Sequence, residues 1–153
     1  MTDAGTAIER AYREHREKLW RSLLLFCGDP EVASDAVAEA FAQAIRRGDA
    51  MRDPGRWVWR AAFSIARGEL KRRRRATPLV DLPVEMPEPT VDLVRGLALL
   101  SPKQRAALIL HHYAGYSTKE TATIIGSTAP AVGVHLQRAR ARLRVLLKES
   151  DDA

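Results

Sequence analysis

Residues 57–75 read Trp57-Val-Trp-Arg-Ala-Ala-Phe-Ser-Ile-Ala-Arg-Gly-Glu-Leu-Lys-Arg-Arg-Arg-Arg75 and join aromatic side chains to a run of positive charge. At about 100° per residue, one stripe of a helix collects polar, cationic and indole side chains: Trp57, Arg60, Ser64, Arg67, Lys71 and Arg75. The opposite side collects apolar side chains: Val58, Trp59, Ala62, Phe63, Ala66 and Leu70. The spacing therefore predicts one helix with a buried face and a basic face.

The basic face has the chemistry of a nucleic-acid surface. Guanidinium groups neutralise phosphates and release counterions, and an exposed indole stacks on an unpaired base. This mixture suits single-stranded or melted DNA better than intact duplex. The alternative is a solvated basic helix end, which charge runs commonly form.

Composition favours an acidic partner. The 153 residues carry a net charge of +6 and give a pI near 10.0, and these values favour nucleic acid, with an anionic membrane surface as the alternative. Cys27 is the one cysteine, so no internal disulfide forms, and no Cys/His cluster has zinc-ligand spacing. These features fit a reducing compartment.

The chain shows no sign of export or membrane insertion in its sequence. Asp3, Glu9 and Arg10 stand where a secretory signal would need an apolar core. No uninterrupted apolar run approaches the length of a membrane span. We expect a cytoplasmic protein without membrane insertion.

The order of start and stop signals predicts an all-α fold of two small helical domains. Helices are expected at about 6–27, 30–47 and from 54 to 76, and the first domain is 1–76. Residues 77–92 are rich in proline, carry a local charge of −4, and are predicted to be a linker. The domains on either side, 1–76 and 93–153, each carry +5.

The second domain has the spacing of a helix-turn-helix. Two capping boxes, Ser101 to Gln104 and Ser117 to Glu120, start helices, and Gly126 lies in the turn before the last helix. The candidate DNA-contacting residues on that helix are Thr128, Val134, His135, Gln137, Arg138 and Arg142. The alternative is a helical hairpin that packs against protein.

Together these parts resemble the extracytoplasmic-function (ECF) RNA polymerase sigma factors of bacteria. The resemblance covers nearly the whole chain. In the first domain it rests on Asp29-Pro-Glu-Val-Ala-Ser-Asp-Ala-Val-Ala-Glu-Ala-Phe41 and Arg52-Asp-Pro-Gly-Arg-Trp-Val-Trp-Arg60. In the second it rests on Leu100-Ser-Pro-Lys-Gln-Arg-Ala-Ala-Leu108, Gly115-Tyr-Ser-Thr-Lys-Glu-Thr-Ala-Thr-Ile-Ile-Gly126 and Gln137-Arg-Ala-Arg-Ala-Arg-Leu143.

The resemblance implies that the first domain binds the clamp of core RNA polymerase and holds the melted minus-ten strand of promoter DNA. It assigns Asp35, Glu39 and Phe41 to the polymerase, and Trp57, Arg60 and Ser64 to the unpaired strand. The other candidate minus-ten contacts, to the DNA backbone, are Arg67, Lys71, Arg72 and Arg73.

The resemblance also implies that the second domain docks at the minus-thirty-five element. The acidic linker would thread polymerase channels that otherwise hold nucleic acid. An anti-sigma factor is a further implied partner.

The sequence holds no catalytic constellation, no phosphate-binding glycine loop and no metal-ligand set, so we predict a protein without enzymatic activity or cofactor. Two other functions stay open from the residues alone. A free-standing helix-turn-helix regulator would footprint duplex DNA without polymerase. A protein-interaction module with reduced DNA binding would keep its function without Trp57 and Arg60.

Overall fold

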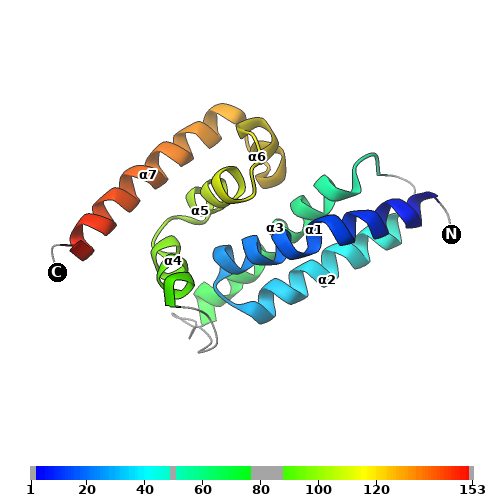
Figure 1. The fold of residues 1–153 in the computed structure, drawn as a ribbon, viewed down its shortest axis with the longest axis horizontal. Coiled ribbons are helices and arrows are strands. Elements are labelled where there is room, and N and C mark those ends of the chain that lie inside the picture. Colours follow the sequence, from blue (N-terminus) through cyan, green and yellow to red (C-terminus); the bar gives the residue numbers. More distant parts are fainter. Residues whose placement is uncertain (1–2, 49–50, 77–87, 152–153) are drawn as a thin grey trace.

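The computed structural model describes residues 3–48, 51–76 and 88–151, and every regular element within them is a helix. The predicted all-α class is confirmed. Three long helices lie side by side, and α5, α6 and α7 form a second group next to them (Figure 1). The helices are α1 (Asp3–Cys27), α2 (Pro30–Arg47), α3 (Pro54–Ala76), α4 (Glu88–Ala98), α5 (Pro102–Leu108), the π-helix η2 (Ile109–Tyr113), α6 (Thr118–Ile125) and α7 (Ala129–Asp151).

Helix α2 begins and ends at local capping signals. Asp29 caps α2, and its carboxylate accepts hydrogen bonds from the amides of Glu31 at 2.8 Å and Val32 at 3.3 Å. Gly48 ends α2 with a φ of 64°, which glycine adopts without steric cost. The apolar side of α3 is buried as predicted at Val58, Trp59, Ala62, Phe63 and Ala66.

The helix-turn-helix is also present. Ser117 and Glu120 form the predicted capping box at the start of α6, with both hydrogen bonds at 3.0 Å. Gly126 ends α6 in the left-handed region, with a φ of 69°, and Thr128 caps α7 by accepting a bond from the Ala131 amide at 3.2 Å. The turn therefore follows from local chemistry that the sequence displays.

Helix α4 begins at Glu88, so its first residues overlap the predicted linker 77–92. Pro89 lies in the first turn of α4, where its missing N–H would have no helical partner in any case. The rest of the predicted linker, 77–87, lies outside the described residues.

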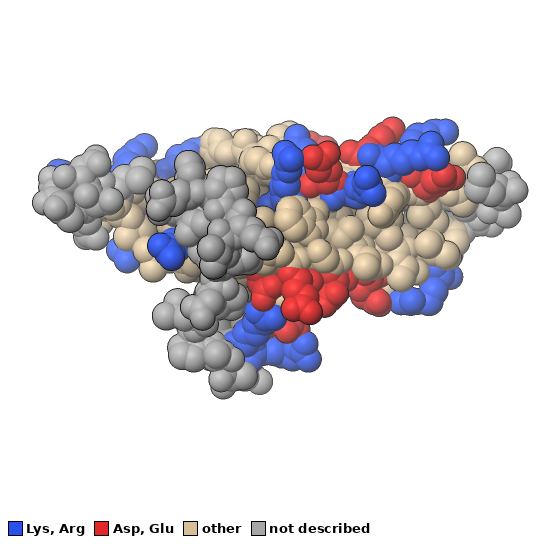
Figure 2. All heavy atoms as spheres, turned by 60° about the horizontal axis from the view of Figure 1, so that its bottom comes forward, with Lys and Arg blue, Asp and Glu red and all other residues tan. Residues whose placement is uncertain are grey.

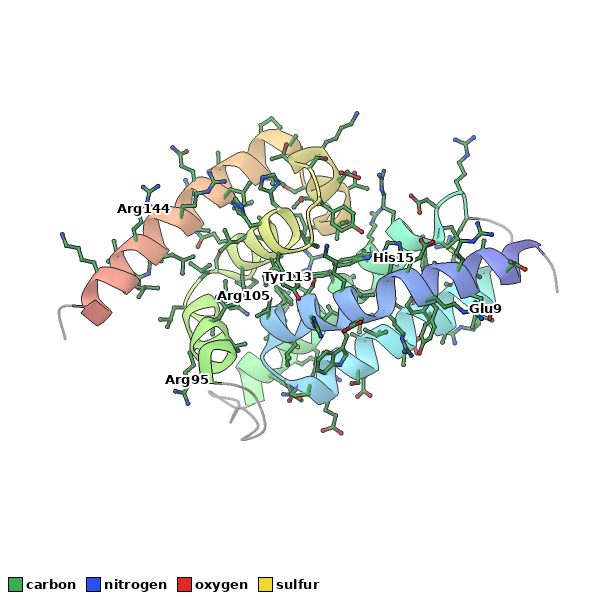
Figure 3. All side chains as sticks on the ribbon, viewed as in Figure 1. Glu9, His15, Arg95, Arg105, Tyr113 and Arg144 are labelled. Atoms are coloured by element: carbon green, nitrogen blue, oxygen red, sulfur yellow. The ribbon has the colours of Figure 1, made fainter. Side chains whose placement is uncertain are left out.

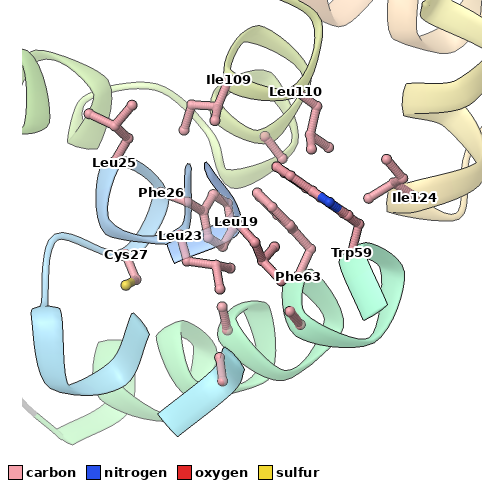
Figure 4. Close-up of a cluster of buried hydrophobic side chains, with 14 of the residues drawn as sticks. Leu19, Leu23, Leu25, Phe26, Cys27, Trp59, Phe63, Ile109, Leu110 and Ile124 are labelled. Atoms are coloured by element: carbon pink, nitrogen blue, oxygen red, sulfur yellow. The ribbon is translucent and has the colours of Figure 1, made fainter. Parts of the chain in front are cut away.

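One apolar core spans both helical groups, which the sequence did not predict. Leu19, Phe26 and Trp59 of the first group pack in one cluster with Leu110 and Ile124 of the second (Figure 4). All five side chains are nearly or fully inaccessible to solvent. The two predicted domains therefore form a single packed body in this structure.

Trp59 connects several parts of this core. Its Nε1–H donates to Nδ1 of His15 on α1 at 3.1 Å, so the buried indole nitrogen has a partner. Its ring lies edge-on to Tyr116, with centroids 5.1 Å apart, and is stacked on Phe63 of its own helix. His15 is partly buried, and its bond with Trp59 gives it a structural role within the first helical group.

Arg105 is a buried cation at the junction of the two groups, with 4% of its surface exposed (Figure 3). Its guanidinium donates to backbone carbonyls at the ends of two helices and in the turn after α4. The acceptors are Phe26 at 2.7 Å, Leu97 at 2.8 Å, Leu100 at 3.0 Å and Ala98 at 3.3 Å. The guanidinium thereby supplies donors to carbonyls at helix ends, although the Leu97 carbonyl also accepts from the Leu100 amide at 3.0 Å.

Replacing Arg105 by methionine is expected to destabilise the protein strongly. Methionine keeps much of the side-chain volume but leaves buried carbonyls unsatisfied, which costs about 1–3 kcal/mol for each group. We expect a loss of about 3 kcal/mol or more in the free energy of unfolding, measured by urea denaturation. Arg95→Met on the exposed side of α4 is the control and should change stability by less than about 0.5 kcal/mol.

A pair of glycines on α3 provides a second test. A Cβ at Gly55 would lie 2.6 Å from Nε2 of His15, whereas a Cβ at Gly68 would meet nothing within 4 Å. Gly55→Ala must displace a histidine that Trp59 holds, so we expect it to destabilise by about 1–3 kcal/mol. Gly68→Ala should stabilise by about 0.5–1 kcal/mol through helix propensity. Equal melting temperatures for the two variants would contradict this packing.

Candidate nucleic-acid interface

The predicted strand-binding stripe of α3 is only partly available to a ligand. Arg60, Ser64 and Lys71 are exposed, and none of these three side chains has an ion-pair partner among the described residues. Trp57 is half-buried, and the guanidinium of Arg47 lies 5.5 Å from the centre of its ring. An indole flanked by exposed cations can stack on a base while phosphates are neutralised beside it.

Arg73 has a structural contact that the sequence pattern did not reveal. Its Nη1 donates to Oδ2 of Asp29 at 2.6 Å, and its Nε lies 3.4 Å from Glu69. Burial alone would raise the pKa of Asp29, but the bonds from Arg73 and from the amides of Glu31 and Val32 hold that pKa below its usual value. Arg73 therefore fastens the end of α3 to the start of α2.

Two further arginines of α3 also have partners within the chain. Arg72 pairs with Glu69 on the same helix. Arg67 donates from Nη1 to the carbonyl of Ile125 at the end of α6, at 3.2 Å. The side chains of Arg74 and Arg75 lie outside the described residues. The basic run thus divides into exposed cations and cations that hold helices together.

The candidate residues at the start of α7 are mostly accessible. Val134 is 43% exposed, and Gln137, Arg138 and Arg142 are also exposed. Thr128 is exposed, but its hydroxyl is occupied as the helix cap. An apolar group, an amide and two guanidiniums along one helix can contact a thymine methyl, a base edge and phosphates.

A basic groove of about 570 Å³ lies between α3 and the second helical group. It is lined by Arg67, Leu70 and Lys71 of α3, by residues 101–104, and by His135 and Arg138 of α7. Burial, followed by the nearby charges of Lys103 and Arg138, lowers the pKa of His135. The lowered pKa favours the neutral imidazole, in which one ring nitrogen donates and the other accepts.

The outward face of α2 carries exposed carboxylates. Figure 2 views this side and shows acidic side chains beside a strip of uncharged surface. Asp35 and Glu39 are exposed, and Glu39 accepts from Gln43 at 3.1 Å and pairs with Arg46 at 2.9 Å. The bond from Gln43, and then the bond from Arg46, keeps the pKa of Glu39 below its ordinary value.

Phe41, the third candidate polymerase contact, lies in the core. It is 5% exposed, and its ring meets Tyr12 edge-on, with centroids 5.0 Å apart.

A neighbouring groove of about 410 Å³ on the same side was not predicted from the sequence. It is lined by Tyr12, Arg16, Glu17, Trp20, Ser34, Val37 and Ala38. Tyr12 is 41% exposed, so only the packing of α1 on α2 reveals the groove.

The described residues contain no group of three histidine, cysteine or acidic side chains that could hold a metal ion. Cys27 is buried, and burial raises the pKa of its thiol to about 11. A search of the same described residues found no helix with the length and hydropathy to cross a membrane.

Comparison with known proteins assigns the second helical group to a family. Residues 90–143 match the model of sigma-70, region 4. This range contains α5, η2 and α6, and most of α7, so it includes the whole helix-turn-helix turn.

Similarity to curated proteins extends over nearly the full chain. The RNA polymerase sigma-E factor of Streptomyces avermitilis is 32% identical over 160 residues, which cover 94% of this chain and 87% of that protein. The ECF RNA polymerase sigma factor SigL of Mycobacterium tuberculosis is 31% identical over 164 residues, covering 95% and 92%.

Two solved structures share the fold. CnrH, in complex with the cytosolic domain of CnrY, superposes with a TM-score of 0.77 at 23% identity, covering 96% of this chain and 91% of CnrH. The sigma factor RpoE of Bartonella quintana, in complex with the anti-sigma factor NepR, gives 0.72 at 20% identity, covering 92% and 96%. With full-length relatives above 30% identity and a matched region 4, this chain belongs to the ECF RNA polymerase sigma factors, which bind core RNA polymerase and direct it to promoters.

Proposed function

We propose that this sigma factor divides its work among three surfaces: the acidic face of α2, the basic stripe of α3 and the start of α7. Residues 1–76 would serve polymerase binding and the minus-ten element, and residues 93–153 the minus-thirty-five element. The observation that carries this proposal is the stripe of α3, where exposed Arg60, Ser64 and Lys71 flank Trp57. The polymerase carries out RNA synthesis, and this chain supplies promoter recognition and strand separation.

The strand-binding surface is Trp57, Arg60, Ser64 and Lys71. Because an indole stacks on any base and cations follow the backbone, this set favours a strand that has left the duplex. Arg67, Arg72 and Arg73 are less available, since each has a partner within the chain. Strand contacts from these three would require those partners to be released.

Asp35 and Glu39 would meet basic groups on the polymerase clamp. Both are exposed, and acidic side chains at an interface rim mainly raise the association rate and fix orientation. Phe41 contributes indirectly, since its ring packs beneath Tyr12 and holds α1 against α2. The groove at Tyr12 and Trp20 lies on the same side and extends the uncharged part of this surface.

Helix α7 would read the upstream element through Val134, His135 and Gln137. Arg138 and Arg142 would contact phosphates, and Thr128 caps the helix. In line with the family, we propose that the acidic residues of 77–92 enter polymerase channels that also hold nucleic acid. Because CnrH and RpoE were each crystallised with a partner protein, we propose that an anti-sigma factor controls this chain too. It would act in the cytoplasm, with polymerase and DNA.

The strand-binding stripe can be tested with holoenzyme on a forked promoter. Trp57→Ala removes a stacking platform worth about 1–3 kcal/mol per base, so we expect about 5- to 150-fold weaker binding of the forked DNA. Lys71→Ala should lower the salt dependence of binding by about 0.7 for each phosphate that the lysine no longer neutralises. The promoter sequence used in this test is identified by run-off mapping on genomic DNA.

Arg73→Ala is the matched control for Lys71→Ala. Because Arg73 is engaged with Asp29, its removal should reduce thermal stability while leaving the salt dependence of binding unchanged. Holoenzyme that opens promoters normally without both Trp57 and Arg60 would refute the proposed surface.

The polymerase surface can be tested by charge reversal. Asp35→Lys with Glu39→Lys places two cations where two carboxylates stand, and we expect roughly tenfold or greater loss of affinity for core polymerase. The control is Glu14→Lys, an equally exposed carboxylate on α1. If both variants bind core polymerase like the parent in fluorescence anisotropy, α2 is not the contact surface.

A further inference from the structure

The groove of about 570 Å³ between α3 and the second helical group collects cations from three helices. Arg67 and Lys71 line it from α3, Lys103 from the start of α5 and Arg138 from α7. Lys71, Lys103 and Arg138 are exposed, and none of them has an ion-pair partner among the described residues. None of the described residues that line the groove is acidic. The described part of the chain therefore leaves this positive charge without a counter-charge.

These cations act on one another across the groove. His135 lies among them, and burial, followed by the charges of Lys103 and Arg138, lowers the pKa of its imidazole. A nearby cation lowers the pKa of a histidine because it repels a second positive charge. A multivalent anion in the groove would relieve that repulsion, and like charges gathered in one cleft focus the field that attracts such an anion.

The uncharged polar groups of the groove are placed to donate hydrogen bonds. The hydroxyl oxygen of Ser101 accepts from the Gln104 amide at 3.2 Å, so the hydroxyl hydrogen is left to donate. The side-chain oxygen of Gln104 accepts from the Ser101 amide at 3.3 Å, so the NH2 end of that side chain is left to donate as well. A groove of donors and cations suits a ligand made of charged acceptors, and phosphate oxygens are such acceptors.

The size of the groove fits a compact ligand. Small-molecule sites usually measure about 300–1,000 Å³, and this groove falls within that range. A chain of two or three phosphates carries several charges in a small volume. An acidic peptide spreads its carboxylates along a backbone that must itself be ordered, which costs more conformational entropy. Leu70 and Pro102 add an apolar wall that a nucleoside could contact.

We propose that this groove is a binding site for a short polyphosphate chain, either free or carried by a nucleotide, with Lys71, Lys103 and Arg138 as its charged contacts. Arg67 takes a smaller part, because its Nη1 already donates to the Ile125 carbonyl at 3.2 Å. The site goes beyond the proposed function, in which Lys103 has no role. Because Lys71 and Arg138 are also proposed to contact DNA, a bound polyphosphate would leave fewer cations for the promoter. That consequence rests on the proposed function, whereas the site does not.

Calorimetric titration of the full chain with tripolyphosphate, without DNA or polymerase, tests the site. Lys103→Gln removes one charged contact, so we expect roughly tenfold weaker binding. Lys119→Gln is the matched control and should bind like the parent. Both lysines are exposed and lie two residues after the serine cap of a helix, but Lys119 does not line the groove. Absence of binding up to about 1 mM, or equal losses in the two variants, would overturn the proposal.

The pKa of His135, measured by NMR titration, gives a second readout at the site itself. A polyphosphate beside Lys103 and Arg138 opposes their charges, so saturating tripolyphosphate should raise the pKa of His135. His112 is the internal control, because burial and then the charge of Arg140 lower its pKa, but it does not line the groove. If tripolyphosphate moved neither pKa, or both by the same amount, the anion would bind elsewhere and the assigned site would be wrong.

Three other ligands identify the chemistry that the groove selects. Orthophosphate reaches fewer cations and should bind more weakly than tripolyphosphate, and equal binding would contradict a site for a phosphate chain. ATP without magnesium should bind at least as tightly as tripolyphosphate. Equal affinity assigns the site to the phosphate chain alone, and tighter binding of ATP adds contacts of the nucleoside with the apolar wall. A ten-residue glutamate peptide that binds more tightly than both would assign the groove to an acidic protein segment and refute the polyphosphate site.

Discussion

Arg105 is the charge on which the arrangement of the helices depends, because one guanidinium meets the ends of α1 and α4 and the turn that leads into α5. Helix ends leave their last carbonyls without intrahelical partners, and burying them without donors costs free energy. Arginine suits the position since its planar fork offers five donors and never loses its charge. The four carbonyls it binds replace part of the water that a buried cation gives up.

That contact has a consequence for the second helical group. Because Arg105 lies within α5, its bond to Phe26 helps to set where α5 and η2 sit on α1, and η2 carries Leu110 into the shared core. The helix-turn-helix then follows α5, and α6 contacts α3 through the Arg56–Glu120 ion pair and the bond from Arg67 to the Ile125 carbonyl. A stable position for the DNA-reading helix is thus determined by backbone carbonyls far from α7.

Local sequence signals predicted the helices well, but they did not predict contacts between residues that are far apart in the chain. The caps at Asp29, Ser117 and Gly126 act within a few residues, so the sequence displays both partners of each bond. By contrast, Arg105 meets Phe26 79 positions away, and Arg73 meets Asp29 44 positions away. A linear pattern shows that an arginine is present but not which carbonyl or carboxylate receives it. The burial of Phe41 follows the same rule, since its partner Tyr12 lies on another helix.

The basic run of α3 shows why charge counting overstates a binding surface. Arg60 and Lys71 point to solvent, whereas Arg67 holds α6 and Arg73 holds α2, so equal charges on one helix perform different tasks. A solvated cation that binds a phosphate releases a counterion from the DNA. An arginine that is already paired with a carboxylate gains less binding free energy, because that ion pair must first be broken. Net charge therefore indicates the kind of ligand, while the number of cations without a partner in the chain limits how strongly such a ligand is held in this arrangement.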